Sequence, residues 1–148
     1  MLPQHVELVG EAERQLERGG ELLDGVETPE QRGPILGGVV QDVVVSPDGQ
    51  TLYAANEAGW LDVIHLPSGR CTATVELGTP ALGVGLSADA SHLFVGLLDA
   101  GRVLVLQRQG LVERASVAVG GRPRLIATHP DGDAVLVANE AGWVDLLR

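Results

Sequence analysis

The amino-acid sequence predicts an all-β fold made of about three four-stranded sheets that follow one another along the chain. The six residues Ala55–Trp60 recur unchanged as Ala138–Trp143, 83 positions later, and a diverged third copy, Gly96–Arg102, lies midway between them. The repeat is therefore about 41 residues long. Short apolar runs separated by turn residues fill each copy. A repeat of this length and content is typical of the blades of a β-propeller.

Each repeat begins with a short apolar strand that ends in a tight turn. The first strands are Val43–Ser46, Val84–Ser87 and Ile126–His129, and the turns that follow are Pro47–Gly49, Ala88–Ala90 and Pro130–Gly132. In a Pro-Asp-Gly turn, Pro presets φ, Asp bonds to its own backbone and Gly accepts a positive φ. The middle copy lacks both Pro and Gly, so we expect a looser turn there.

The remaining strands of each repeat are also short and almost continuously apolar. The second strands are Leu52–Ala55, Leu93–Gly96 and Val135–Ala138; the third are Trp60–Leu66, Arg102–Gln107 and Trp143–Leu147; the fourth are Cys71–Leu77 and Ala115–Val119. Strands of four to seven residues with this pattern suit sheets that are covered on both faces. The alternation that starts at Cys71 predicts that this single cysteine is a buried small hydrophobe.

The repeats occupy residues 34–148, and the last of them lacks its fourth strand. We assign the sheets to residues 41–78, 82–121 and 124–148. Residues 34–38 align with the end of the outer strands, Val75–Gly78 and Val117–Gly121. The sequence thus predicts a clasp strand at residues 34–38 that supplies the strand missing from the last repeat.

Residues 1–33 fit the repeat poorly. Glu11–Arg18 is rich in helix formers, and a Gly-Gly pair at 19–20 ends the run, which predicts a short helix followed by a linker. A second interpretation takes His5–Glu11 and Gly20–Val26 as two strands of a degenerate fourth blade.

The repeats from Gln41 to Arg148 resemble the YVTN-type β-propeller family. Ser46–Gly49, Leu52–Asn56 and Val135–Asn139 carry the resemblance. Members of that family include lactonase-like enzymes, surface-layer proteins and haem-carrying reductase domains, so the resemblance does not choose a function. Its members usually carry seven blades on one chain, whereas this chain has three.

Three blades do not readily close a ring, because propellers contain four to eight. An open arc would leave the outer faces of its first and last blades apolar and wet, at a cost on the order of 10 kcal/mol per face. The sequence therefore predicts a homodimer that forms a six-bladed ring by strand exchange. If residues 5–38 form a blade, the count becomes four per chain. A remnant without an independent role is a third interpretation.

Composition excludes several classes of partner. Ten arginines and no lysine stand against twenty acidic residues, for a net charge of −10. Because an acidic surface repels phosphate backbones, we expect no nucleic-acid partner. The apolar runs are too short to span a membrane, and the first residues lack the pattern of a secretory leader, so we expect a cytoplasmic protein.

Candidate site residues gather at the second-to-third-strand turns. In a closed ring these turns would form one rim that could attract a basic partner or hold Ca²⁺, although Asn and Glu also simply make a soluble hairpin. The rim candidates are Asn56, Glu57, Trp60, Asp99, Asn139, Glu140 and Trp143. The two tryptophans either form a binding ledge or cover a neighbouring sheet while their indole N–H stays in water.

Three polar residues end the first strands and are candidates to face a central channel: Ser46, Ser87 and His129. The histidine equally suits a cap on its turn. No nucleophile, metal-ligand or phosphate-binding motif is evident, so we assign no catalytic residue, metal or cofactor. The sequence favours a non-enzymatic propeller module that binds itself and a protein partner or small ligand. The alternative is a lactonase-like hydrolase whose channel forms only in the assembled ring.

Overall fold

A computed structural model describes residues 34–148 of the chain. The predicted helix and the alternative degenerate blade both fall within residues 1–33 and so lie outside the described residues. All the described strands belong to one compact unit, Leu36–Arg148. In this part of the chain, no helix is long and apolar enough to cross a membrane.

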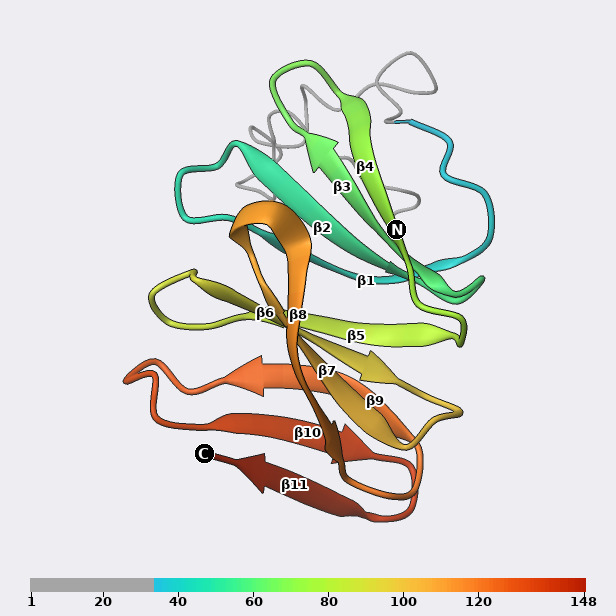
Figure 1. Ribbon diagram of the computed structural model, residues 1–148, viewed down its shortest axis with the longest axis vertical. Coiled ribbons are helices and arrows are strands. Elements are labelled where there is room, and N and C mark those ends of the chain that lie inside the picture. Colours follow the sequence, from blue (N-terminus) through green and yellow to red (C-terminus); the bar gives the residue numbers. More distant parts are fainter. Residues whose placement is uncertain (1–33) are drawn as a thin grey trace, which may run out of the picture. The chain divides into compact units, whose positions relative to one another are not determined.

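The described residues form three antiparallel sheets with all strands in chain order (Figure 1). The first sheet contains β1 (Val40–Val45), β2 (Thr51–Asn56), β3 (Trp60–His65) and β4 (Arg70–Glu76). The second contains β5 (Ala81–Leu86), β6 (His92–Leu97), β7 (Arg102–Gln107) and β8 (Val112–Ala118), with a short 3₁₀ turn, Gln109–Leu111, before β8. The third contains β9 (Pro123–Thr128), β10 (Val135–Asn139) and β11 (Trp143–Leu147). The prediction of an all-β fold is confirmed, and the arrangement is consistent with a partial, propeller-like β fold.

The sheets pack face to face through their first strands, because β5 lies against both β1 and β9. Glycines on β5 permit the approach to the third sheet. A Cβ added at Gly83 would lie 2.1 Å from the carbonyl oxygen of Arg124, and one at Gly85 would lie 2.9 Å from Ile126 Cγ2. Close contact of two backbones therefore requires residues without a side chain here.

Two apolar clusters fill the spaces between the sheets. The cluster between the first and second sheets is the larger and includes Tyr53, Leu61, Val63, Val84, Leu93, Val95 and Leu104. The cluster between the second and third sheets includes Phe94, Val103, Ile126, Val135 and Val137. The inner strands of the second sheet thus have neighbours on both faces, which explains why β5, β6 and β7 are apolar at nearly every position.

The turn of the middle repeat is as tight as the others, so the expectation of a looser turn is wrong. Ala90 adopts φ 61°, in the left-handed region, and its N–H donates to the carbonyl of Ser87 at 2.8 Å. The equivalent bond from Gly49 to Ser46 is also 2.8 Å. Ser87 and Asp89 hold the turn by the same hydroxyl–carboxylate bond that Ser46 and Asp48 make, and this bond offsets the strain of a non-glycine residue.

Cys71 is exposed, so the prediction of a buried cysteine is also wrong. The pairing of β3 with β4 shifts at this point: Val63 pairs with Ala73, but Ile64 pairs with Cys71, which leaves Thr72 as an extra residue. Such a bulge reverses the alternation of side chains. Ala73 packs on the core, whereas the Cys71 side chain lies on the other face of an outermost strand.

Residues 34–38 form no strand in this single chain. Gly37 and Gly38 instead take positive φ values of 74° and 58°, as Gly120 and Gly121 do at 74° and 54°. The two glycine pairs therefore form the same turn before β1 and before β9, as their alignment predicts. Pairing of this segment with another chain stays a prediction.

Candidate functional site

The two asparagines of the predicted rim are structural. Asn56 is fully buried; its side-chain amide donates to the carbonyl of Gly37 at 2.8 Å, and its oxygen accepts from the N–H of Ala58 at 2.9 Å. Asn139 repeats both bonds, to Gly120 at 3.0 Å and from Ala141 at 3.0 Å. Each amide joins a glycine turn to the next hairpin, so neither asparagine is available to a ligand.

Two of the predicted rim carboxylates are neutralised by arginine. Arg122 bridges Asp99 at 2.8 Å and Glu140 at 2.9 Å, and Arg124 binds the second oxygen of Glu140. Hydrogen bonds from Arg124 and Arg122 lower the pKa of Glu140 below its ordinary value. The Asp99 and Glu140 carboxylates are thus bound to arginine side chains. Among residues 34–148, no group of three or more metal-ligating side chains comes together.

The remaining rim carboxylate, Glu57, accepts a hydrogen bond from the Gln41 side chain at 2.5 Å. It lies on the β2–β3 hairpin and is exposed. The rim of the described residues is thus a mixture of one exposed acid and an acid–arginine network, rather than a crown of carboxylates.

The two tryptophans occupy equivalent positions but different surroundings. The Trp60 indole N–H is buried and has no acceptor among residues 34–148, which contradicts the expectation of a solvated N–H. Trp143 is about half exposed, and its N–H donates to Asp145 at 3.0 Å. In the first sheet, Thr74 of β4 donates to the equivalent Asp62 at 3.1 Å. Trp143 therefore takes the bond that a fourth strand makes in a complete sheet.

The three residues proposed to face a channel hold their own turns, and their place in a ring stays a prediction. Ser46 Oγ donates to Asp48 at 2.6 Å and accepts from the N–H of Thr51 at 3.0 Å. Ser87 makes the same pair of bonds, at 2.7 and 3.0 Å, and His129 Nδ1 accepts from the N–H of Asp131 at 3.1 Å. The hydrolase alternative gains no converging nucleophile and base from these residues.

Asp42 is the polar group of β1 that reaches the second sheet. One carboxylate oxygen accepts from the N–H of Val84 at 3.2 Å, and the other from the N–H of Val43 at 3.0 Å. Burial raises the pKa of Asp42 above its ordinary value, although both bonds act against that shift. The carboxylate thus satisfies a backbone donor on the free edge of β5.

The outward faces of the first and third sheets carry exposed apolar side chains. On the first sheet, Val43 is 48% and Val45 is 45% exposed. On the third sheet, Leu125 is 49%, Val144 64% and Leu146 47% exposed. We call these residues the first and third open faces. Large apolar groups gathered on a face are typical of an interaction surface.

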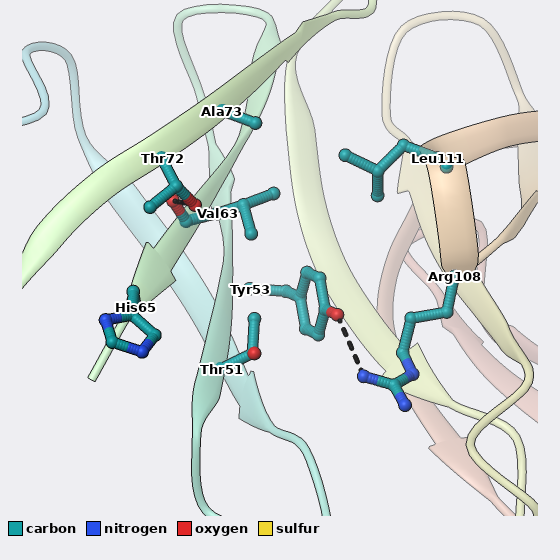
Figure 2. A pocket seen from close by; sticks show the side chains of 9 residues that line it. Thr51, Tyr53, Val63, His65, Thr72, Ala73, Arg108 and Leu111 are labelled. Carbon is teal, nitrogen blue, oxygen red and sulfur yellow. Dashed lines mark hydrogen bonds between the residues drawn. The ribbon is translucent and has the colours of Figure 1, made fainter. Parts of the chain in front are cut away.

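A groove of about 380 Å³ lies between the first and second sheets (Figure 2). It is lined by Thr51, Tyr53, Val63, His65, Thr72, Ala73, Arg108, Gly110 and Leu111. Figure 2 shows Arg108 reaching across to the Tyr53 hydroxyl, which accepts from the guanidinium at 3.3 Å. Sequence reasoning missed this groove, because its walls come from residues 55 positions apart. The available signal was a charged residue, Arg108, at the place of Leu66 in the repeat.

Comparisons with known proteins bear on the fold alone. No family model and no curated protein matches the chain. Among solved structures, the chain is similar to hydrazine synthase of Kuenenia stuttgartiensis, with a TM-score of 0.68 and 24% identity over 78% of this chain. The match covers 36% of that protein's chain, so the present chain spans about a third of it. At this identity the likeness shows a shared β architecture and nothing about activity.

Proposed function

We propose that the chain is a non-enzymatic β-propeller module that completes itself by binding a second copy. In this assembly, the third open face of one copy packs on the first open face of the other, and the reciprocal contact closes a six-bladed ring. Each sheet would then have a neighbour on both sides, as the second sheet has within one chain.

The observation that carries the proposal is that exposed apolar residues on the open faces align, in the repeat, with residues that are buried between sheets. By repeat alignment, Val144 corresponds to Leu61 and Val103, which are fully buried between sheets. Val43 likewise corresponds to Val84, which is 3% exposed. Val144 and Val43 are thus apolar at positions that are packed between sheets elsewhere in the chain, whereas Leu125 stands at the place of Asp42 and Gly83. Each such side chain contributes about 1.5–3 kcal/mol when fully buried.

The exposed segment before β1 supports the same arrangement. Ile35 is 88% exposed, and β11 is the last strand of a three-stranded sheet. The neighbouring sheets each have a fourth strand at this place. Strand exchange through residues 34–36 would cover both the isoleucine and the free edge of β11, which removes a known aggregation hazard.

The mass in solution tests the proposal. Size-exclusion chromatography with light scattering on the full chain should give about 31 kDa, twice the chain mass of 15.5 kDa. A mass of one chain at concentrations of tens of micromolar would contradict the proposal.

A charge on the third open face should prevent association. Val144→Asp places an unpaired carboxylate at the centre of each contact, and two-fold symmetry places it in both contacts. We therefore expect a monomer. The matched control is Val112→Asp, which changes a valine that is 49% exposed on β8, outside both faces, and should leave the dimer intact.

A further inference from the structure

The groove of Figure 2 contains an arginine without a carboxylate partner among the described residues. Arg108 forms no ion pair there, whereas Arg122 and Arg124 both pair with acids. Arg102 and Arg114 likewise form no ion pair among the described residues, but Arg108 is the arginine that lines this groove. The pKa of Asp48 is lowered mainly by the hydrogen bond from Ser46 and, to a smaller degree, by the charge of Arg108. The Arg108 guanidinium nevertheless makes no ion pair among the described residues. It stands ready to bind an anion.

The guanidinium is held in place before any ligand arrives. Arg108 Nε donates to the carbonyl of Ala90 at 2.6 Å, and one terminal nitrogen donates to the Tyr53 hydroxyl at 3.3 Å. The Ala90 carbonyl is itself positioned by the left-handed conformation of that residue. A fixed guanidinium loses little freedom on binding, so it suits the two-pronged recognition of a carboxylate.

The rest of the groove is divided between apolar and polar side chains. In Figure 2, Ala73 and Thr51 lie on the first-sheet side of the groove, and Leu111 lies on the opposite side near Arg108. The Tyr53 side chain itself is almost wholly buried, so its ring forms the floor. A volume of about 380 Å³ is within the range of small-ligand sites. One charged group beside an apolar wall favours a ligand with one charged end.

We infer that this groove binds a small monocarboxylate with an apolar body. The Arg108 guanidinium takes the carboxylate, and Leu111, Val63 and Ala73 contact the apolar body. The net charge of −10 disfavours ligands with several negative charges. Both walls belong to one chain, so the site goes beyond the proposed assembly and does not depend on it.

Octanoate is a suitable probe, with octanamide as its neutral counterpart. Isothermal titration calorimetry on the full chain should show octanoate binding, with octanamide at least about tenfold weaker because it lacks the charge that Arg108 recognises. Equal binding of the two probes, or no octanoate binding at about 1 mM, would overturn the inference. Displacement of octanoate by an equal concentration of inorganic phosphate would also overturn it, by showing a plain anion site.

Two substitutions locate the site. Arg108→Gln should weaken octanoate about tenfold or more, whereas Arg114→Gln, an arginine on the neighbouring β8, should leave the affinity unchanged. Ala73→Leu fills the apolar side of the groove while Arg108 is kept, so it should also weaken octanoate. Thermal unfolding checks that each variant is folded. Wild-type affinity in both groove variants would show that the ligand lies elsewhere and that the inference is wrong.

Discussion

Single residues close the turns of this molecule, and they do so by two different means. Gly49 has a φ of 74° and open space where a Cβ would stand. Gly121 also has a positive φ, 54°, but a Cβ there would lie 2.3 Å from Asn139 Oδ1. The first glycine is required by conformation alone. The second is required by conformation and by the amide that packs on it.

The two glycines should therefore differ in their response to alanine. Gly49→Ala should lower the free energy of unfolding by about 1 kcal/mol, the cost of a left-handed alanine. Gly121→Ala should lower it by about 3 kcal/mol, because the displaced Asn139 amide also loses its hydrogen bonds. Urea denaturation monitored by circular dichroism measures both. Equal losses would show that the amide does not stabilise this turn.

The Asp89 carboxylate, in the turn of the middle repeat, should stabilise the folded state, and this stabilisation should be lost in acid. Hydrogen bonds from Ser91 and Ser87 lower the pKa of Asp89 to about 2, from 3.8 in an unperturbed aspartate. As the pH falls, Asp89 therefore binds its proton at a higher pH in the unfolded chain than in the folded chain. The stabilisation is complete above about pH 4 and is lost as the pH falls towards about 2.

Asp89→Asn should accordingly weaken the dependence of the unfolding free energy on pH in this window. Urea denaturation at a series of pH values between about 4 and 2 provides the measurement. Glu113→Gln, on the exposed surface of β8, alters the net charge equally and serves as the control. An unchanged pH dependence in Asp89→Asn would contradict the assigned role of the two serines.

At the scale of elements, the β5 strand decides how closely the sheets approach. Gly83 meets the backbone of Arg124, whereas Gly96 on β6 is less crowded, with its nearest atom at 3.4 Å from an added Cβ. Gly96 also aligns with Ala55 and Ala138 of the other repeats. The two glycines therefore lie at the same packed face but under different constraints.

Gly83→Ala should loosen the third sheet from the second. The added methyl collides with a backbone that cannot yield without moving β9, at a cost of about 1–3 kcal/mol or more. Gly96→Ala is the matched control and should cost clearly less. Hydrogen exchange should show faster exchange of the β9 and β10 amides in Gly83→Ala. Identical exchange in the two variants would mean that β5 does not set the spacing.

At the scale of the whole molecule, the proposed ring depends on the segment before β1. Residues 34–36 align with the end of the outer strands that β11 lacks, and Gly37 and Gly38 complete the turn that Asn56 holds. Deleting the residues before Gly37, while keeping both glycines, would remove the proposed clasp and leave the open faces unchanged. Such a deletion separates the contribution of strand exchange from that of face-to-face packing.

A chain that lacks residues 1–36 should keep its three sheets and lose dimer stability, because the proposed clasp is gone while the Asn56 contact remains. Light scattering over a dilution series reports the association, and circular dichroism reports the sheets. The full chain is the reference. Retention of the same dimer at every concentration would argue against strand exchange but leave face-to-face packing open.

Much of the fold could be predicted because each repeat has the same local sequence pattern. Apolar runs and turn residues recur at fixed offsets, so eleven strands in chain order follow from Val43 to Leu147. Predictions failed where the conformation or exposure of a residue depends on contacts with other parts of the structure. The turn at Ala90 is rescued by Asp89, and Cys71 is turned outward by a one-residue shift in pairing.

For the candidate sites, too, the sequence predicted local features but not contacts between distant residues. The repeat showed that the rim residues are equivalent. It did not show that the Asn56 amide donates to the Gly37 carbonyl, or that Arg122 forms ion pairs with acids on two different hairpins. The Arg108 groove is made by two sheets that meet only on folding.

For residues 34–148, the amino-acid sequence alone predicted the three sheets, their strand order and the positions of their turns, because hydrophobic periodicity and turn chemistry act within a few residues. Only the tertiary structure decided which polar groups are spent on internal bonds, which apolar faces stay exposed and where a groove opens. Those outcomes depend on distances between residues far apart in the chain, and no local pattern encodes such distances.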